Sequence, residues 1–331
     1  MTTMRAAFYE RNGAAREVLR VADVPRPEPA AGDVRVRLAT SGVNPSDIKT
    51  RGNLRGTGMA FPRVIPHSDG AGTIDAVGDG VAAARLGQRV WVWNGAWRRA
   101  FGTAAQWITL PAAQAVPLPA NVDFAAGACL GIPALTALHA VRMDGGVTGK
   151  SVLVTGGAGA VGHYAVQMAR LAGASQVMAT VSNEAKAALA SAAGADVTIN
   201  YREEDVAARV LVATDGRGVD RIIETDFASN VGADFQAVAA EGDIVVYGSG
   251  QPDIAVPFFA AILKNVRVRF FIVYNLAPAD RAATLAQLDA WLRAGALTHN
   301  VALRMPLEKI ADAHEAVEHG AVMGNVVVEI D

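Results

Sequence analysis

The residues best suited to chemistry are glycines that follow a short run of β-branched and aliphatic residues. The run Ser151–Thr155 precedes Gly156, Gly159 and Gly162 in a GxxGxxG spacing, and His163–Ala172 has helical character. Glycine lets backbone N–H groups approach a pyrophosphate, and the N-terminus of the following helix adds a partial positive charge. Because strand, glycine turn and helix come in this order, the cluster predicts a dinucleotide-binding site rather than glycines used only for packing. The expected cofactor contacts are Gly156, Gly159, Ala160 and Val161.

A second set of residues distinguishes NADPH from NADH. Enzymes that use NAD place an acid at the end of the second strand, where it holds the ribose hydroxyls. Here the strand Gln176–Val181 is followed by Ser182, and Lys186 lies one helical turn into the next element. A hydroxyl and an ammonium suit a 2′-phosphate, whereas Glu184 would repel it and is expected to cap the helix and face solvent. Tyr201 follows the third strand and is expected to cover the adenine, so the pattern favours NADPH. The alternatives are a solvated lysine and an acid that holds the ribose.

The elements around these residues alternate between strand and helix. Further strands are expected at 197–200, 221–224 and 243–247, with helices at 184–193, 203–213 and 230–238. Strict alternation of this kind means a parallel, doubly wound sheet. The predicted fold class is therefore α/β, with a Rossmann sheet in the middle of the chain.

The two ends of the chain have a different pattern. Short strands are expected at 5–9, 34–39, 70–77, 89–93 and 106–110, with turns rich in Gly and Pro between them. Such close spacing predicts a compact β-rich domain up to residue 125. A helical stretch follows at 125–142, and the C-terminal part has helices at 278–294 and 307–319 and a strand at 325–330. Because that strand needs a sheet to join, the C-terminus is expected to return to the first domain.

Composition excludes several classes of protein. A chain of 331 residues suggests two domains, and 30 basic against 32 acidic residues leave no basic surplus for nucleic-acid binding. The single cysteine, Cys129, can form neither an intrachain disulfide nor a Cys-rich zinc lobe. The first residues lack an apolar signal segment, and the long uncharged stretches 124–141 and 151–169 contain glycine and polar residues. We therefore expect a soluble cytoplasmic protein without nucleic-acid or membrane partners.

Six further stretches carry a family resemblance. They are GVNPSD at 42–47, PHSDGAGTIDAVG at 66–78, GQRV at 87–90, LGIPALTA at 130–137, INYREE at 199–204 and PLEKIADAH at 306–314. Together with the glycine cluster, they resemble the zinc-independent quinone oxidoreductases of the ζ-crystallin type, within the medium-chain dehydrogenase/reductase superfamily. The motifs span nearly the whole chain in the order that the family has.

The resemblance implies a GroES-like β-rich catalytic domain built from both chain ends, and a Rossmann domain in the middle with NADPH in the cleft between them. The implied boundaries are 1–125 for the first part of the catalytic domain, 126–264 for the Rossmann domain and 265–331 for the return.

The resemblance also implies roles for single residues. It places Asn44 at the nicotinamide end of the cofactor and Thr136 near the nicotinamide ribose. It matches Ser182, Lys186 and Tyr201 to the 2′-phosphate and adenine positions, and Gly248 and Ser249 to a further cofactor-lining turn.

Zinc independence is implied by the same resemblance. Zinc relatives in the superfamily have cysteines at the positions of Asn44 and Leu130. Cys129 is next to Leu130 in the sequence, but its side chain is expected to point away from the position that a zinc ligand would occupy. His67 and Asp69 without a thiolate make a poor catalytic zinc site. His67 is therefore expected to be a hydrogen-bonded structural residue.

The region expected to bind substrate departs from the family. Where many quinone reductases carry tyrosines, this chain has Lys49 and residues 53–55. A loop rich in Trp and Arg follows at 91–101, in which Trp91 is expected to pack in the core. The side chains that suit a flat aromatic pocket wall are Trp93, Trp97 and Phe101.

The expected reaction is hydride transfer from NADPH to a quinone without a metal, in which the protein orients and desolvates the reactants. A hydroquinone anion can take its proton from water, and the sequence shows no acid–base dyad. An enone or enoyl compound is the alternative substrate, with Lys49 or Asn44 as donor to its oxygen. The second alternative, an NADPH-binding protein with a structural or RNA-associated role, gains no support from the near-neutral charge.

A homodimer is also implied. By resemblance, the apolar segment Val266–Tyr274 forms the edge of the Rossmann sheet, where an uncovered strand invites pairing and a two-fold partner would continue the sheet. Arg267 and Arg269 are expected to face solvent while Phe270 faces inward. The alternative is that C-terminal helices of the same chain cover this strand.

Overall fold

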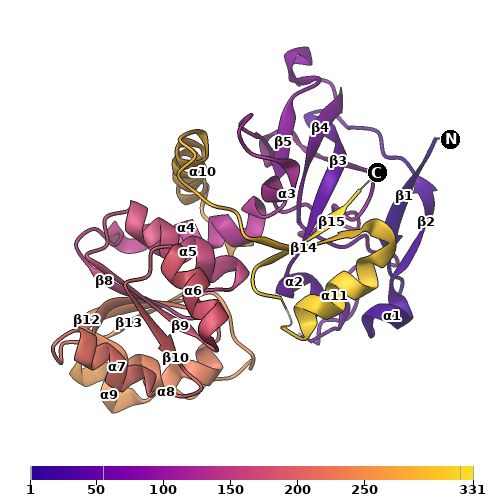
Figure 1. Ribbon diagram of the computed structural model, residues 1–331. Helices are drawn as coiled ribbons and strands as arrows, with labels where there is room; N and C mark the ends of the chain where they lie inside the picture. Colours follow the sequence, from indigo (N-terminus) through magenta and orange to yellow (C-terminus); the bar gives the residue numbers. More distant parts are fainter. Residues whose placement is uncertain (1, 55, 321, 331) are drawn as a thin grey trace. The chain divides into compact units, whose positions relative to one another are not determined.

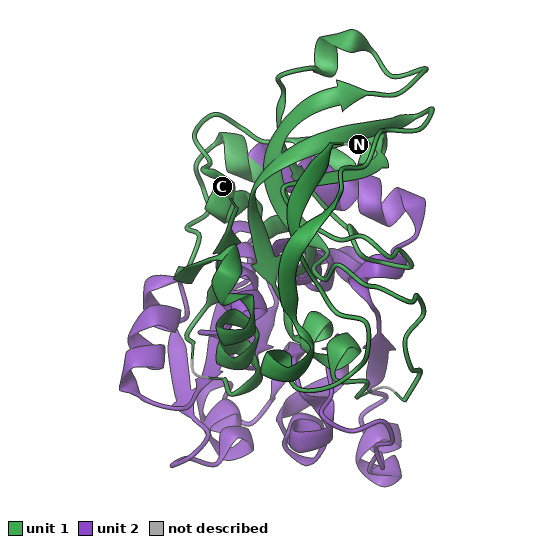
Figure 2. Ribbon diagram, turned by 90° about the vertical axis from the view of Figure 1, so that its right-hand side faces the viewer, with its two compact units in different colours: residues 1–132, 291–331 green, residues 133–290 purple. Residues whose placement is uncertain are grey.

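The chain forms two compact units. A computed structural model describes residues 2–54, 56–320 and 322–330; Arg55 of the predicted substrate region lies outside them. Unit 1 comprises residues 1–132 and 291–331, and unit 2 comprises residues 133–290 (Figure 2). These limits differ from the predicted boundaries, because residues 126–132 belong to unit 1 and residues 265–290 to unit 2.

Unit 2 contains a six-stranded parallel sheet in the order β10-β9-β8-β11-β12-β13. The order reverses between β8 and β11, as in a doubly wound Rossmann sheet. The predicted fold class is confirmed. The strands are β8 (Ser151–Val154), β9 (Gln176–Val181), β10 (Val197–Asn200), β11 (Val219–Glu224), β12 (Val238–Val246) and β13 (Arg267–Phe270).

Helices cover both faces of this sheet, with α4 to α6 packed together on one face and α7 to α9 on the other (Figure 1). Because both faces are covered, the strands are apolar throughout their middle rather than alternating, as Leu153, Ile222 and Ile244 show. The helices are α4 (Leu135–Arg142), α5 (Ala160–Leu171), α6 (Glu184–Ala192), α7 (Val206–Ala213), α8 (Phe227–Ala237), α9 (Phe258–Leu263) and α10 (Pro278–Arg293).

The edge strand β13 differs in one respect from its prediction. Arg267 and Arg269 are exposed as expected, but Phe270 is 65% exposed and meets only the edge of the Phe227 ring. The prediction that Phe270 faces inward is wrong, because an edge strand has a neighbouring strand on one flank only.

Unit 1 is built on a seven-stranded, mostly antiparallel sheet in the order β14-β15-β3-β4-β5-β7, with β6 paired to β3, and on a two-stranded sheet of β1 and β2. The final strand, β15, pairs with β3 through Val326 and Val43, so the predicted return of the C-terminus to this sheet is confirmed. The strands are β1 (Thr3–Phe8), β2 (Arg20–Pro25), β3 (Asp33–Val43), β4 (Asp69–Val77), β5 (Arg89–Val92), β6 (Trp107–Pro111), β7 (Ala115–Pro117), β14 (Val301–Pro306) and β15 (Asn325–Glu329).

The helices of unit 1 are short, and one predicted helix is broken. The expected helix 125–142 begins as α3, passes through a π-helical segment that contains Pro133, and continues as α4. Proline lacks the N–H that a regular helical turn requires. The unit 1 helices are α1 (Ala15–Val18), α2 (Pro45–Arg51), α3 (Phe124–Gly127) and α11 (Ile310–Glu318). Among the described residues, no helix has the length and apolar character needed to cross a membrane.

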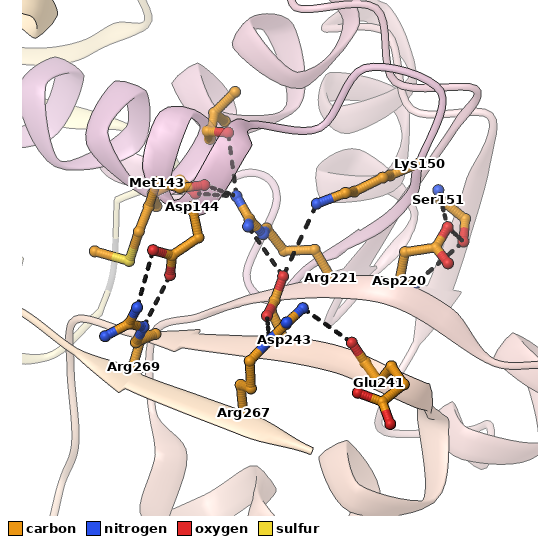
Figure 3. Close-up of polar contacts among 12 residues, drawn as sticks. Met143, Asp144, Lys150, Ser151, Asp220, Arg221, Glu241, Asp243, Arg267 and Arg269 are labelled. Carbon is orange, nitrogen blue, oxygen red and sulfur yellow. Dashed lines mark hydrogen bonds and ion pairs between the residues drawn. The ribbon is translucent and has the colours of Figure 1, made fainter. Parts of the chain in front are cut away.

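A buried ion pair fastens the sheet of unit 2 to the end of α4 (Figure 3). The fully buried Arg221 donates to Asp243 Oδ2 at 3.0 Å and to the carbonyl oxygen of Met143 at 2.8 Å. Asp243 Oδ1 also accepts from Arg267 Nε at 2.6 Å. Burial alone would raise the pKa of Asp243, but the hydrogen bonds from Arg267 and Arg221 lower it below its ordinary value. The carboxylate therefore stays ionised in the interior.

Replacing Arg221→Met is expected to reduce the free energy of unfolding by about 3 kcal/mol, because the buried Asp243 and the end of α4 lose their main donor. Chemical denaturation measures this change. The matched control is Arg217→Met, which removes an exposed pair with Asp220 and is expected to cost less than about 1 kcal/mol. Equal effects of the two substitutions would contradict the prediction.

Candidate functional site

The glycine turn after β8 has the close backbone approach that a dinucleotide requires. Gly156 has φ +67°, and a Cβ on Gly162 would lie 2.1 Å from the carbonyl oxygen of Gly156. Gly159 is the N-cap of α5, so the helix begins at Ala160 and Val161. The first N–H groups of a helix have no acceptor within the helix and attract an anion. The turn therefore fits a pyrophosphate.

The predicted 2′-phosphate residues meet at the ends of β9 and β10. Lys186 Nζ donates to Ser182 Oγ at 2.9 Å, and the backbone N–H of Tyr201 donates to the carbonyl oxygen of Val181 at 3.1 Å. The Tyr201 side chain is 51% exposed, which leaves room for a base against its ring. A hydroxyl, an ammonium and an aromatic ring thus lie at one edge of the sheet.

Glu184 is exposed at the first residue of α6, but it is not the cap that was predicted. The N-cap is Asn183, whose Oδ1 accepts the backbone N–H of Lys186 at 2.9 Å. Asparagine is a better N-cap than glutamate because its short side chain reaches the N–H two or three residues ahead.

The remaining residues of unit 2 that were predicted to bind the cofactor lie in two places. Gly248 and Ser249 follow β12, and Thr136 lies in the first turn of α4. A Cβ on Gly248 would lie 2.1 Å from the carbonyl oxygen of Thr225, so only glycine allows the loop after β12 to pass the end of β11. Ser249 Oγ follows in this loop and donates to the carbonyl oxygen of Gln251 at 2.7 Å. Thr136 is buried in the first turn of α4.

In unit 1, Asn44 is fixed between two buried carboxyl groups. Asn44 Nδ2 donates to Asp69 Oδ2 at 2.9 Å, and the backbone N–H of Asn44 donates to Asp47 Oδ2 at 2.8 Å. Asp69 Oδ2 also accepts the backbone N–H of Ile132 at 3.0 Å. These contacts fix the amide of Asn44 at the start of α2. Lys49, the other predicted catalytic residue, is half-buried in the last turn of the same helix.

The sequence analysis gave Asp47 no role and considered Asp69 only as a zinc ligand, so it did not predict that both carboxyl groups would contact Asn44. Burial raises the pKa of Asp47 to about 7, although backbone N–H groups of Asn44 and His67 lower it. Burial, together with the charge of Asp47, raises the pKa of Asp69 well above its ordinary value. The spacing of Asn44 and Asp47 is that of a capping box, and this signal would have identified Asp47.

His67 belongs to a buried hydrogen-bond chain. Thr103 Oγ1 donates to the carbonyl oxygen of Asp69 at 2.5 Å, so it accepts from Ser41 Oγ at 2.7 Å. Ser41 in turn accepts from His67 Nδ1 at 2.8 Å, which leaves His67 Nε2 to accept from His314 Nε2 at 2.8 Å. Nδ1 of His314 then carries no proton and has no partner among the described residues. This series of hydrogen bonds links β3, the start of β4 and α11.

Two family models match the chain. The model described as "Alcohol dehydrogenase GroES-like domain" matches residues 30–120, and the model described as "Zinc-binding dehydrogenase" matches residues 160–290. Proteins named "Quinone oxidoreductase" from Rattus norvegicus and Homo sapiens are both 30% identical to the chain; the rat alignment covers 94% of each protein, and the human one 92% of this chain and 91% of that protein.

The chain belongs to the medium-chain dehydrogenase/reductase superfamily. It is an oxidoreductase with a nucleotide-binding fold. Two solved structures illustrate the similarity. An NAD-dependent alcohol dehydrogenase is 30% identical with a TM-score of 0.90, covering 99% of this chain and all of that one. A mycobacterial protein complexed with NADPH is 28% identical with a TM-score of 0.87, covering 98% of this chain and all of that one.

The resemblance matched Asn44 and Leu130 to the positions where zinc relatives carry cysteines. Asn44 is engaged by Asp69, and Leu130 is a buried apolar residue. Both ring nitrogens of His67 are hydrogen-bonded to protein groups. Cys129 is buried and its Sγ donates to the carbonyl oxygen of Ala125 at 3.3 Å. No group of three or more His, Cys, Asp or Glu among the described residues is arranged to hold a metal ion.

The aromatic loop of this superfamily member divides into buried and accessible side chains. Trp91 is 1% exposed, which confirms the prediction that it packs in the core. Trp93 and Trp97 are half-buried, and Phe101 is 52% exposed. The Arg98 guanidinium lies 5.6 Å from the centre of the Trp97 ring. Aromatic faces therefore remain accessible in this loop.

The buried histidine chain predicts loss of stability in acid. Burial lowers the pKa of His67 to about 3, so as pH falls below about 6.5 the unfolded chain takes up a proton that folded His67 does not. The free energy of unfolding of the wild type should fall relative to that of His67→Gln by up to about 1.4 kcal/mol per pH unit between about pH 6 and pH 4.

Urea denaturation at several pH values measures this difference. The control His319→Gln replaces an exposed histidine and should give a curve parallel to that of the wild type. A His67→Gln curve that also runs parallel would show that His67 is not held neutral by burial.

Proposed function

We propose that the protein is an NADPH-dependent quinone oxidoreductase that transfers hydride from the nicotinamide to a quinone without a metal. The observation that carries the cofactor proposal is the Lys186 Nζ–Ser182 Oγ contact of 2.9 Å beside the exposed ring of Tyr201. An ammonium and a hydroxyl at the end of the second strand suit a 2′-phosphate, and a ribose-binding acid is absent from that strand end.

The cofactor would be held by backbone groups and side chains of unit 2. Ala160 and Val161 suit the pyrophosphate because they begin α5, where backbone N–H groups have no acceptor within the helix. Gly156 and Gly159 shape the turn that lets the pyrophosphate approach; their own N–H groups donate to Thr180 Oγ1 and to the carbonyl oxygen of Gly156. By resemblance, Thr136 is assigned to the nicotinamide ribose, and Gly248 and Ser249 to a further turn that lines the cofactor. NADPH supplies the hydride when bound, and the substrate oxygen takes a proton from water.

In unit 1, Asn44 is proposed to lie at the nicotinamide end. Its Nδ2 donates to Asp69 Oδ2, so the amide nitrogen points toward Asp69. The amide oxygen is then the part of the side chain that can contact the reactants. Lys49 is proposed as a donor to the substrate oxygen, and Trp93, Trp97 and Phe101 as the aromatic wall that receives a planar ring. The named relatives support a quinone as substrate.

Oxidation of NADPH by a panel of quinones, enones and acrylates tests the proposal, followed through the absorbance of the reduced cofactor. Turnover of phenanthrenequinone that persists after dialysis against a chelator supports a metal-free quinone reductase. Turnover of enones alone would replace it with an alkene reductase. Binding of NADPH without any turnover would favour a non-enzymatic role, and activity restored by added zinc would contradict metal independence.

NADPH is expected to bind at least about tenfold more tightly than NADH, and Lys186→Ala should remove most of this preference. The substitution should leave NADH affinity within about twofold, because NADH carries no 2′-phosphate to pair with the ammonium. Fluorescence titration of both cofactors measures the effect. Lys150→Ala is the control, since this lysine lies beside Asp243 at the other end of the strands. Equal wild-type affinities would make Glu184 the ribose ligand instead.

We also propose that the protein is a homodimer joined through the edge strand β13. The flank of β13 away from β12 has no neighbouring strand in the described chain. Beside it, the short helix α9 exposes large apolar side chains: Phe258 is 63%, Phe259 75% and Leu263 82% exposed. An exposed edge next to an apolar patch is typical of an interface between copies.

Light scattering at micromolar concentration is expected to give twice the 34.4 kDa mass of one chain. The double substitution Phe259→Asp and Leu263→Asp should shift the mass toward one chain, because it buries charge in the interface. Leu86→Asp, at a 50% exposed position of unit 1, is the matched control. A wild-type mass of one chain would contradict the dimer.

A further inference from the structure

Two buried carboxyl groups meet in unit 2, and no step described above uses them. Glu224 is the last residue of β11 and Asp234 lies on α8; they are 0% and 2% exposed. A side-chain hydrogen bond with Glu224 is one of the causes that raise the pKa of Asp234. Glu224 Oε2 and Asp234 Oδ2 receive no hydrogen bond from any other described residue. Two carboxyl oxygens can bond only through a proton, so the pair holds one proton between its members.

Neighbouring donors decide which member of the pair is charged. Glu224 Oε1 accepts the backbone N–H of Asp226 and Asn230 Nδ2, the latter at 3.0 Å. Burial raises the pKa of Glu224, and these donors partly offset the rise. Burial and the charge of Glu224 raise the pKa of Asp234 to about 9. Asp234 therefore keeps its proton at neutral pH, and Glu224, which accepts more hydrogen bonds, is the member of the pair that bears negative charge more readily.

No cation among the described residues lowers the pKa of either carboxyl group. Asp226 in the following turn adds negative charge, and burial raises the pKa of Tyr247, which directly follows β12, so this phenol is neutral. Lys264 Nζ, which follows α9, binds the carbonyl oxygens of Phe235 and Val238 at the end of α8. On α7, Arg209 pairs with Glu204. Loss of the shared proton would therefore place two unscreened negative charges in contact.

The pair is connected to the loop that was assigned to the cofactor. The carbonyl oxygen of Glu224 accepts the backbone N–H of Tyr247 at 3.1 Å. Asp226 Oδ1 accepts the backbone N–H of Gly250 at 2.7 Å, and the N–H of Phe227 donates to the carbonyl oxygen of Gly248 at 3.1 Å. A displacement of the Glu224 carboxylate would move Asp226 and, with it, the loop 248–250.

We propose that Glu224 and Asp234 are positioning residues for the dinucleotide, and that their shared proton holds the turn 225–227 and the loop 248–250 in the shape that binds the cofactor. Release of the proton to solvent at alkaline pH forces the two carboxylates apart and weakens binding. The proposal rests on the dinucleotide binding proposed above.

NADPH affinity of the wild type and of Asp234→Asn across the alkaline range tests the proposal. The wild-type Kd should rise by about tenfold between about pH 7.5 and pH 10, since the pair loses its proton there. The Kd of the variant should change by less than about threefold, because its amide N–H donates to Glu224 at every pH. Asp215→Asn, at an exposed turn, should follow the wild type. Equal weakening in the wild type and in Asp234→Asn would overturn the proposal.

Unfolding in the absence of cofactor separates this proposal from the proposed function. The pKa of Asp234 is higher in the folded chain than in the unfolded one, so the Tm of the wild type should fall relative to that of Asp234→Asn from about pH 4 to about pH 9 and then stay constant. A Tm difference that does not change with pH would overturn the shared proton. A Tm difference that changes with pH would support the shared proton even if NADPH did not bind at neutral pH. Absence of NADPH binding would instead contradict the proposed function and, with it, the positioning role of the pair.

Discussion

The nucleotide-binding unit depends on how closely the backbone can approach itself at the carboxyl ends of its strands. A Cβ on Gly162 or on Gly248 would lie 2.1 Å from a carbonyl oxygen, Gly156 O in the first case and Thr225 O in the second. Both contacts exist because these residues have no side chain. They bring the N-terminus of α5 and the loops after β11 and β12 to one edge of the sheet, at the position where the strand order reverses.

A second constraint acts on polar groups in the interior, because burying such a group costs free energy unless it is hydrogen-bonded. Arg221 is tolerated because Asp243 and the carbonyl groups at the end of α4 surround its guanidinium. Asn44 Nδ2 donates to Asp69 Oδ2, and His67 is held neutral within a series of hydrogen-bonded hydroxyl and imidazole groups. Where donors run short, as at Glu224 and Asp234, a proton takes the place of a cation. The same pairing that stabilises each unit thus orients the residues assigned to cofactor and substrate.

Much of the fold was predictable because it depends on local patterns. The strand at 176–181 and the alternation of strand and helix through unit 2 follow from runs of buried residues of the expected length. The GxxGxxG spacing likewise predicted the turn before α5. Less predictable were features that depend on a neighbour. Phe270 is exposed because β13 is an edge, and Pro133 is accommodated by a π-helical segment.

The amino-acid sequence by itself determined the parallel sheet, the glycine turn, the meeting of Ser182 and Lys186 after the second strand and the absence of cysteine at positions 44 and 130, since residue type and short-range spacing carry these properties. Only the tertiary structure decided which distant side chains meet. Asp69 reaches Asn44 across 25 positions and His67 reaches His314 across 247, and chain topology, not local spacing, brings them together. Protonation states were decided at the same level, because desolvation and neighbouring charges exist only once the chain has folded around each group.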